Sequence, residues 1–236
     1  MPLRLALMGS FGLYVDDDGV RLPMSARRLV AFLALARRPV SRLYVAGHLW
    51  SDVPEARAAA SLRSALWRTL RVAEVVRADA DALELSSHVA VDVTDALALA
   101  RRAQDTAVPV APHDVAALVR TDDLLPDWYD EPWLDLEREC FRKLRLRALE
   151  RVCECLIADG RLGEALEAGL AAVAADPLRE SAHRALIRTH LAEGNAAEAL
   201  RQFHAWRRLS ERTLGLPPSA ALLHGPPAVA NPVSPL

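Results

Sequence analysis

Arginine and serine side chains recur at helical spacing between residues 55 and 71. They follow one another at steps of four, three, four and three residues, which places them on one face of a helix. This face comprises Arg57, Ser61, Ser64, Arg68 and Arg71. Arg63 lies on its flank, and no acidic residue follows Glu55 on the helix. Because a surface that serves only solubility usually mixes both signs of charge, the pattern indicates a further use of this face.

Side chains of these types at this spacing can contact double-stranded DNA. A guanidinium donates two hydrogen bonds to guanine O6 and N7 in the major groove, and arginine and serine both bind phosphate oxygens. Small residues at 58–61 allow a close approach to the groove. An ordinary solvated helix face remains the alternative, because basic helix faces are common. Trp67, on the flank, is expected to pack against a neighbouring hairpin rather than to contact a base.

The opposite face of this helix is apolar and is expected to face the core. Its residues recur at the i, i+3, i+4 spacing of a buried helical stripe. They are Leu62, Ala65, Leu66, Thr69 and Leu70.

The elements before and after this helix favour a winged helix-turn-helix. Alternating apolar residues between 3 and 15, followed by the DDDG turn at 16–19, predict short strands. A helix that ends before Pro39 and a short helix over 42–50, capped by Ser41, come next. Residues 75–87 then predict two strands around a turn. In such a unit a later helix enters the major groove while an earlier helix supports it.

The two parts of the chain differ in charge. Of its 29 basic and 31 acidic residues, eleven arginines but only five acids lie within residues 1–72, so the front is basic and the rear acidic. Ala and Leu dominate and aromatic residues are scarce, which favours helices.

Acids and arginines interrupt every long apolar run, so neither a membrane span nor a membrane partner is expected. The few cysteines and the lack of a signal peptide predict a cytoplasmic protein.

The sequence gives no support for catalysis, a cofactor or a metal. It contains no phosphate-binding loop, no nucleotide fingerprint and no nucleophile motif. Cys153 and Cys155 are two residues apart on a predicted helix and point in nearly opposite directions. The histidines of the rear half occupy different helices, whereas zinc needs convergent ligands.

A repeat of tetratricopeptide length marks the second half. Residues 157–167 align with 191–201 at an offset of 34, with Gly, Glu, Ala and Leu matched. Two copies are marginal for a solenoid, so flanking helices over 133–146 and after 216 are expected to cap them.

These patterns together predict a mostly α protein with small β elements. A winged helix-turn-helix is followed by a tetratricopeptide-like helical domain. The predicted divisions are residues 1–95, residues 96–223 and a proline-rich, disordered tail over 224–236.

Four stretches of the chain resemble a known group of proteins. The stretches that carry the resemblance are RRLVAFLALARRPVSRLYVAGHLWSDVPEARAAASLRSALWR (27–68), DDLLPDWYDEPW (122–133), RLRALERVCECLIADGRLGEALEAGLAAV (145–173) and DPLRESAHRALIRTHLAEGNAAEALRQF (176–203). In this order they resemble small members of the antibiotic-regulatory-protein class of actinobacterial transcription activators. That class joins a winged helix to a bacterial transcriptional activator domain.

The resemblance implies roles for particular residues and partners. The helix over 55–71 would be the recognition helix and the hairpin near 75–86 the wing. Arg77 on the wing would contact the minor groove or a phosphate, and Arg42 would contact a phosphate. The DNA-contacting set would be Arg42, Arg57, Ser61, Arg63, Ser64, Arg68, Arg71 and Arg77. Implied partners are double-stranded DNA at direct repeats upstream of biosynthetic genes and RNA polymerase holoenzyme; a homodimer is left open.

The chain departs from this pattern in two places. The family usually continues Trp-Arg-Leu-Arg, whereas this chain reads WRTLR, which shifts Leu70 and Arg71 by about 100° around the helix. Gly225, Pro226 and Pro227 also cut short the family's last helix, which predicts a weak final cap. A tetratricopeptide-type interaction adaptor with a winged helix that does not read DNA is therefore the second interpretation.

Overall fold

The computed structural model describes residues 2–105, 111–219 and 222. The chain forms two compact units, one of Met1–Ala96 with Asp122–Phe141 and one of Leu97–Thr121 with Arg142–Leu236. The units are therefore not continuous segments of sequence. The division at residue 95 and the tail over 224–236 stay predictions, and the tail lies outside the described residues.

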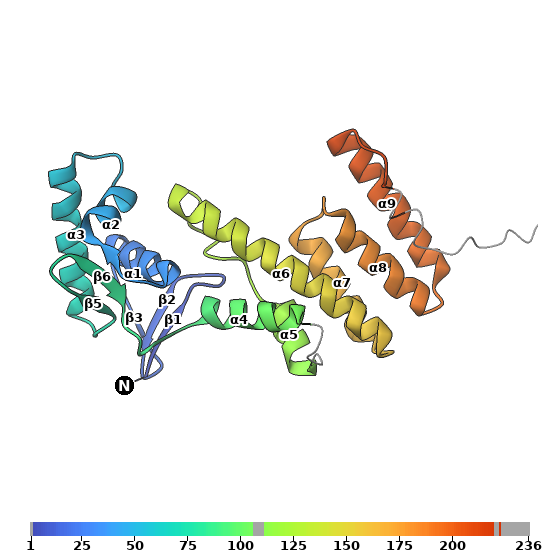
Figure 1. Cartoon of the computed structure of the whole chain (residues 1–236), viewed down its shortest axis with the longest axis horizontal. Helices are drawn as coiled ribbons and strands as arrows, with labels where there is room; N and C mark the ends of the chain where they lie inside the picture. Colours follow the sequence, from blue (N-terminus) through green and yellow to red (C-terminus); the bar gives the residue numbers. More distant parts are fainter. Residues whose placement is uncertain (1, 106–110, 220–221, 223–236) are drawn as a thin grey trace, which may run out of the picture. The chain divides into compact units, whose positions relative to one another are not determined.

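A four-stranded sheet opens the first unit (Figure 1). Its strands, in spatial order, are β3 (Asp18–Val20), β2 (Gly12–Val15), β1 (Leu3–Ala6) and β7 (Val89–Val91), with β1 parallel to β7 and antiparallel to β2. Alternate residues of β1 are buried, as their spacing predicted. Asp16 and Asp17 turn the chain between β2 and β3 at φ of 50° and 70°, a conformation that aspartate tolerates better than most residues.

The winged helix-turn-helix follows. It comprises α1 (Met24–Ala36), α2 (Arg42–Leu49), α3 (Glu55–Leu70) and a small sheet of β4 (Val40–Ser41), β6 (Ala82–Leu85) and β5 (Val76–Ala78). The Ser41 hydroxyl accepts a hydrogen bond from the Tyr44 N–H, so the predicted cap of the second helix is confirmed. Helix α3 contacts both α1 and α2, and β5 and β6 form the hairpin after it.

Residues 122–141 contact the segment that follows β1 although they lie far from it in sequence. Met8 and Leu124 form a β-bridge, and the Leu125 N–H donates to Leu7 O at 2.9 Å. The Arg138 guanidinium then binds the carbonyl oxygens of Leu124, Leu125 and Trp128. One side chain thus satisfies three backbone acceptors that no regular secondary structure pairs.

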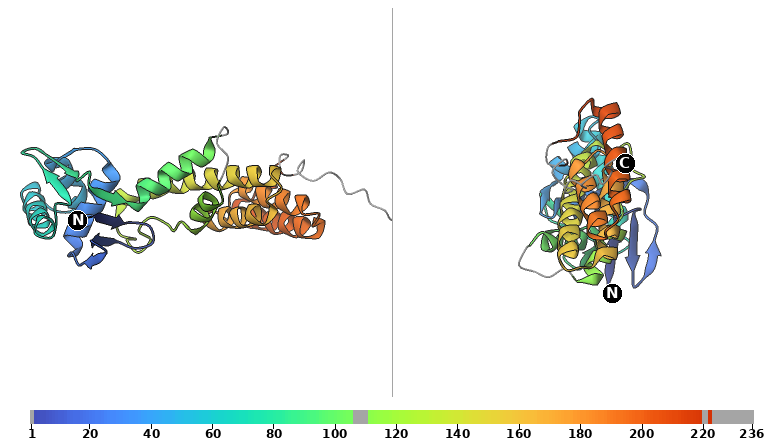
Figure 2. Two further views of the ribbon diagram at one scale, coloured as in Figure 1. Left: turned by 90° about the horizontal axis from the view of Figure 1, so that it is seen from below. Right: turned by 90° about the vertical axis from the view of Figure 1, so that its right-hand side faces the viewer.

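The second unit is helical. It contains part of α4 (Asp92–Gln104), α5 (Pro112–Arg120), part of α6 (Pro132–Ala158), α7 (Leu162–Ala175), α8 (Glu180–Ala192) and α9 (Ala196–Leu214). Helices α7, α8 and α9 lie side by side in sequence order (Figures 1 and 2). Gly160 and Gly194, which the repeat aligns, both adopt positive φ (72° and 76°) just after a helix ends. The predicted fold class is therefore confirmed.

The last described residues close the helical unit. Gly215, at φ 67°, ends α9, and the backbone N–H and the hydroxyl of Ser219 both donate to the Glu180 carboxylate. Leu222 is buried in one cluster with Ile187 and Trp206. The sequence predicted a weak final cap. Within the described residues, this cap is held to the helical unit by the buried side chain of Leu222.

We expect Leu222→Ala to lower the free energy of unfolding by about 2–3 kcal/mol, the lower part of the range for truncating a buried leucine. The substitution removes the apolar anchor while the Ser219–Glu180 hydrogen bonds remain. Urea midpoints of the two proteins measure the change. Leu216→Ala, at an exposed position of the same segment, is the control and should shift the midpoint little. Equal midpoints for Leu222→Ala and the unchanged chain would show that this cap carries no stability.

No helix in the described ranges combines the length and the apolar character that a bilayer crossing needs. Within the same ranges, no three His, Cys, Asp or Glu side chains are grouped so that they could hold a metal ion.

Burial raises the pKa of the Cys153 thiol, which is hydrogen-bonded to the Thr189 hydroxyl at 3.3 Å. This cysteine is therefore a packing residue of the helical unit.

Candidate nucleic-acid interface

Helix α3 is held against the first unit by its apolar face. The buried residues of this face are Ala58, Leu62, Ala65, Leu66 and Thr69. The Thr69 hydroxyl donates to Ala65 O at 3.0 Å, which satisfies a polar group in the core. Leu70, predicted to share the stripe, is 46% exposed. That prediction is wrong because Thr69 takes the inward position, and the next residue is rotated outward by about 100°.

The opposite face of α3 is open to solvent. Arg57, Arg63, Ser64 and Arg68 are exposed, and Ser61 is half-buried. Among the residues that the structure describes, the guanidiniums of Arg57, Arg63 and Arg68 have no hydrogen-bond or ion-pair partner. A ligand can therefore bind them without breaking an internal contact.

Trp67 lies on the surface rather than under the hairpin. It is 59% exposed, and the Arg71 guanidinium carbon lies 4.7 Å from the centroid of its ring. The expectation that it is packed away is therefore wrong. Arg71 follows the last helical residue as the C-cap of α3, so the Trp67 ring and this guanidinium form one exposed pair at the end of the helix.

Arg42 joins the start of α2 to the turn of the β5–β6 hairpin. Its Nε and Nη2 atoms donate to Asp79 O at 3.1 and 2.8 Å, and its backbone N–H donates to Asp81 O at 2.9 Å. Because a guanidinium has five N–H donors, further donors remain for another acceptor. Arg42 therefore positions the β5–β6 hairpin through these hydrogen bonds, and it can do so while its remaining donors bind another acceptor.

Arg77 is paired across the same hairpin. It lies opposite Glu84 in the strand register, and their side chains form an ion pair at 3.0 Å. The arginine keeps 67% of its side-chain surface exposed. Since exposed ion pairs contribute only about 0–1 kcal/mol, a phosphate could compete for this guanidinium.

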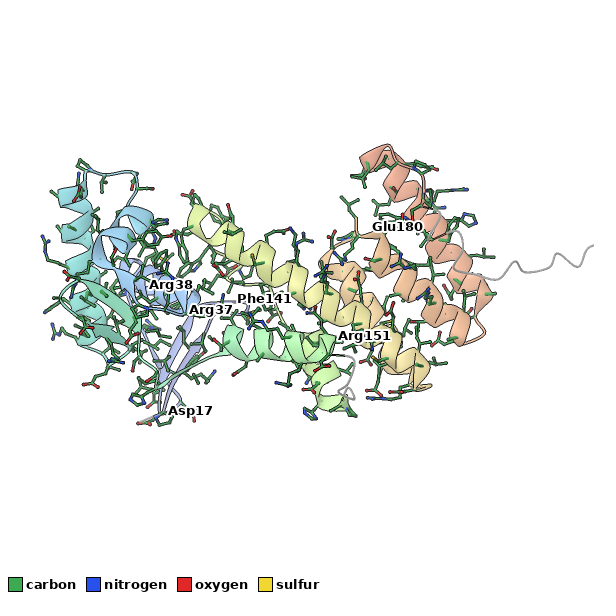
Figure 3. All side chains as sticks on the ribbon, in the orientation of Figure 1. Asp17, Arg37, Arg38, Phe141, Arg151 and Glu180 are labelled. Carbon is green, nitrogen blue, oxygen red and sulfur yellow. The ribbon has the colours of Figure 1, made fainter. Side chains whose placement is uncertain are left out.

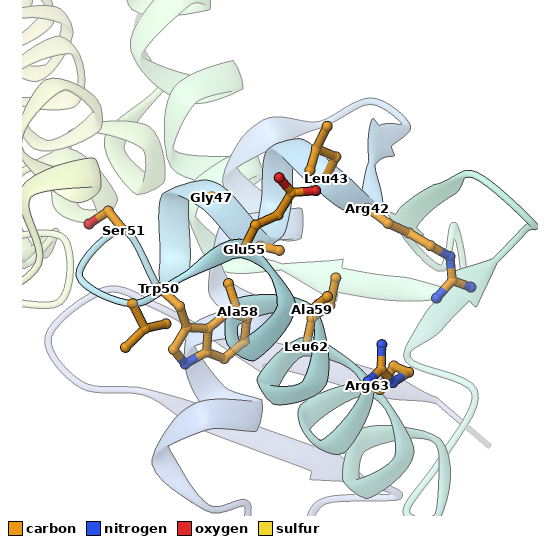
Figure 4. A pocket seen from close by; sticks show the side chains of 12 residues that line it. Arg42, Leu43, Gly47, Trp50, Ser51, Glu55, Ala58, Ala59, Leu62 and Arg63 are labelled. Atoms are coloured by element: carbon orange, nitrogen blue, oxygen red, sulfur yellow. The ribbon is translucent and has the colours of Figure 1, made fainter.

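A groove of about 630 Å³ is lined by residues of both α2 and α3 (Figure 4). Ala46, Ala58 and Leu62 contribute to its apolar surface. Arg42 and Arg63 extend toward the same end of the groove, and Glu55 lies at its rim (Figure 4). The structure thus brings together two predicted residues that the sequence placed on separate helices.

Leu43 and Gly47 also line this groove, and sequence reasoning missed them. Leu43 is exposed, and a Cβ built on Gly47 would meet no atom within 4 Å. Their spacing of four residues puts both on one face of α2, which was the available signal. An apolar groove flanked by guanidiniums can contact a thymine methyl group beside a phosphate.

These elements together define a class of protein. A winged helix-turn-helix with an exposed basic helix, followed by a tetratricopeptide-like helical unit, is the architecture of a transcription regulator. The family model described as "Bacterial transcriptional activator domain" matches residues 87–224, so the chain belongs to that family. The expected architecture of the antibiotic-regulatory-protein class is thereby confirmed.

One solved structure has a similar fold over nearly the whole chain. It is described as Mycobacterium tuberculosis EmbR in complex with low affinity phosphopeptide, and it matches with a TM-score of 0.77 at 21% sequence identity. The match covers 94% of this chain and 63% of the EmbR chain, so this chain spans less than two thirds of that protein's length. A comparison with curated proteins gives no match.

Proposed function

We propose that this transcriptional activator binds promoter DNA in a sequence-specific manner through α3. The observation that carries the proposal is the outward face of this helix, where Arg57, Arg63 and Arg68 are exposed and lack internal partners among the described residues. The buried opposite face holds the helix in place, so its arginines are presented on a rigid element. A helix of this kind fits the major groove of B-form DNA.

Different residues would make different contacts. Arg57, Ser64 and Arg68 are the proposed base-reading residues, because all three are exposed and share one face of α3. Arg42, next to the β5–β6 turn, and Arg77, on β5, are proposed to bind phosphate, which gives affinity and register rather than sequence choice. The remaining proposed contacts are Ser61, Arg63 and Arg71.

The second unit is proposed to bind protein partners. The family description supports a role in activation, and we propose that this unit contacts RNA polymerase holoenzyme, with self-association into a homodimer as a further contact. The proposed setting is the cytoplasm and the proposed target a biosynthetic gene cluster. Neither a cofactor nor an enzymatic step is part of the proposal.

A second candidate function is a protein-interaction adaptor. The observation that favours it is the engagement of Arg42 with Asp79 and of Arg77 with Glu84, which occupies both cations proposed for phosphate. In this case the winged helix would be structural, and the helical unit would carry the function.

Mobility shifts with the intergenic DNA beside the gene test the proposal. At about five phosphate contacts, the affinity should fall by roughly 10²–10³-fold between 50 and 200 mM salt, because each contact releases counterions. A scrambled duplex of the same composition is the control and should bind more weakly. If the protein binds neither duplex but captures a protein partner, the adaptor is the correct function.

A further inference from the structure

A second pocket in the first unit is formed by α1, α2 and the start of α6. Its volume is about 430 Å³, within the range of about 300–1,000 Å³ that is usual for small-ligand sites. Phe32 from α1, Tyr44 and His48 from α2, and Trp133 from α6 contribute aromatic rings to its wall. None of these residues lines the groove between α2 and α3.

The rings form a connected cluster around Phe32. The centroid of its ring lies 6.2 Å from that of Tyr44, 5.9 Å from that of His48 and 5.3 Å from that of Trp133. Phe32 is buried, whereas Tyr44 is 45% exposed and Leu136, at the rim, is 70% exposed. The pocket therefore has a closed aromatic floor and an apolar rim that is open to solvent.

The charges at the pocket favour an anion. Arg37 and Arg38, which follow the end of α1 (Figure 3), both line it. The Arg37 guanidinium is 3.5 Å from the Glu137 carboxylate. The Arg38 guanidinium donates only to the carbonyl oxygen of Pro39, and it meets no carboxylate in the part of the chain that the structure describes. Within the described residues, the positive charge of Arg38 beside the aromatic wall is therefore not neutralised by a carboxylate.

We propose that this pocket binds a small aromatic carboxylate. The flat ring of the ligand packs against Tyr44 and Trp133, since aromatic rings gain from stacked or edge-on contact beyond the area they bury. Its carboxylate accepts hydrogen bonds from Arg38, in the paired geometry that suits a guanidinium. A cationic ligand would suit the rings but would be repelled by Arg38, which has no carboxylate partner among the described residues.

Helix α2 carries both this pocket and the groove described above, on different faces. Tyr44 and His48 face the pocket, whereas Leu43 and Gly47 face the groove between α2 and α3. A ligand in the pocket therefore contacts the helix that Arg42 ties to the hairpin. Any effect of the ligand on DNA affinity rests on the proposed function, but ligand binding itself does not.

Titration calorimetry on the full chain without DNA tests the proposal. The probes are 2-naphthoate, the neutral 2-naphthalenemethanol and the cationic 2-naphthylmethylammonium, which share one ring system and differ in charge. We expect 2-naphthoate to bind most tightly, and Arg38→Gln to weaken it about tenfold through loss of a charge-assisted hydrogen bond. Arg21→Gln removes an exposed arginine that does not line the pocket, and it should leave binding unchanged.

Tyr44→Ala should weaken all three probes, because it removes one wall of the pocket. The proposal is overturned if 2-naphthoate fails to bind at millimolar concentration, if Arg38→Gln binds it as tightly as Arg21→Gln, or if the neutral probe binds equally well. Tighter binding of the cationic probe would instead identify an aromatic cage for ammonium groups. Because these readouts need no DNA, their failure is distinct from failure of the proposed function.

Discussion

Combining Arg57→Ala with Arg68→Ala is expected to weaken specific DNA binding by roughly 100-fold or more. Each base-reading arginine contributes about 1–3 kcal/mol, and the two side chains lie three helical turns apart on the open face of α3. Neither guanidinium has an internal partner within the described residues, so the substitutions should leave the fold and its stability unchanged. Mobility shifts at one fixed salt concentration, with thermal unfolding as a check, measure both effects.

A matched double variant separates base reading from charge. Arg21→Ala with Arg120→Ala removes two exposed arginines from outside α3 and lowers the net charge equally. It should weaken binding only slightly. If both double variants lose affinity to the same extent, the contribution is long-range charge alone. If the α3 variant binds as the unchanged protein does, this face of the helix does not read DNA.

Glu131→Ala is expected to destabilise the first unit by about 3 kcal/mol. The Glu131 carboxylate is 2.6 Å from the Arg28 guanidinium and accepts from the Trp133 indole at 2.5 Å, with 8% of its side chain exposed. Removing one member of a buried ion pair costs about 3–5 kcal/mol, because the remaining charge has no partner. Arg28 keeps 23% exposure and donates to Leu49 O, so the lower end of this range applies.

Urea unfolding followed by circular dichroism measures this effect, with the first transition compared if the two units unfold separately. Glu137→Ala is the control, because it breaks the more exposed pair with Arg37 and should cost about 0–1 kcal/mol. Similar midpoints for the two variants would contradict the assigned role of Glu131. Glu131→Gln should be intermediate, since its amide oxygen can still accept a hydrogen bond.

Periodicity alone was enough for the main features of the fold. The 3.6-residue period of an α-helix separated the buried Leu62 and Ala65 from the exposed Arg57 and Arg68. The 34-residue offset likewise aligned Gly160 with Gly194, and the structure places both just after a helix ends. These features depend on neighbours within a few turns or on one repeat unit, so a sequence pattern can reveal them.

Contacts between distant segments were not predictable in this way. The sequence placed Leu70 in the core and Trp67 against the hairpin, but Leu70 is 46% and Trp67 59% exposed. The pocket that Trp133 shares with Tyr44 also needs two segments that are far apart in the chain. A local sequence pattern does not show which distant segments of the chain will be in contact after folding.

The sequence by itself determined that the front half carries an arginine-rich helix and that the rear half is a helical repeat. Only the tertiary structure decided which arginines are available to a ligand. Arg28 is held by Glu131 and Arg42 by Asp79, whereas Arg57 and Arg68 have no partner among the described residues. The physical reason is that a guanidinium is neutralised or satisfied by acceptors from remote segments, and only folding brings those acceptors within hydrogen-bond distance.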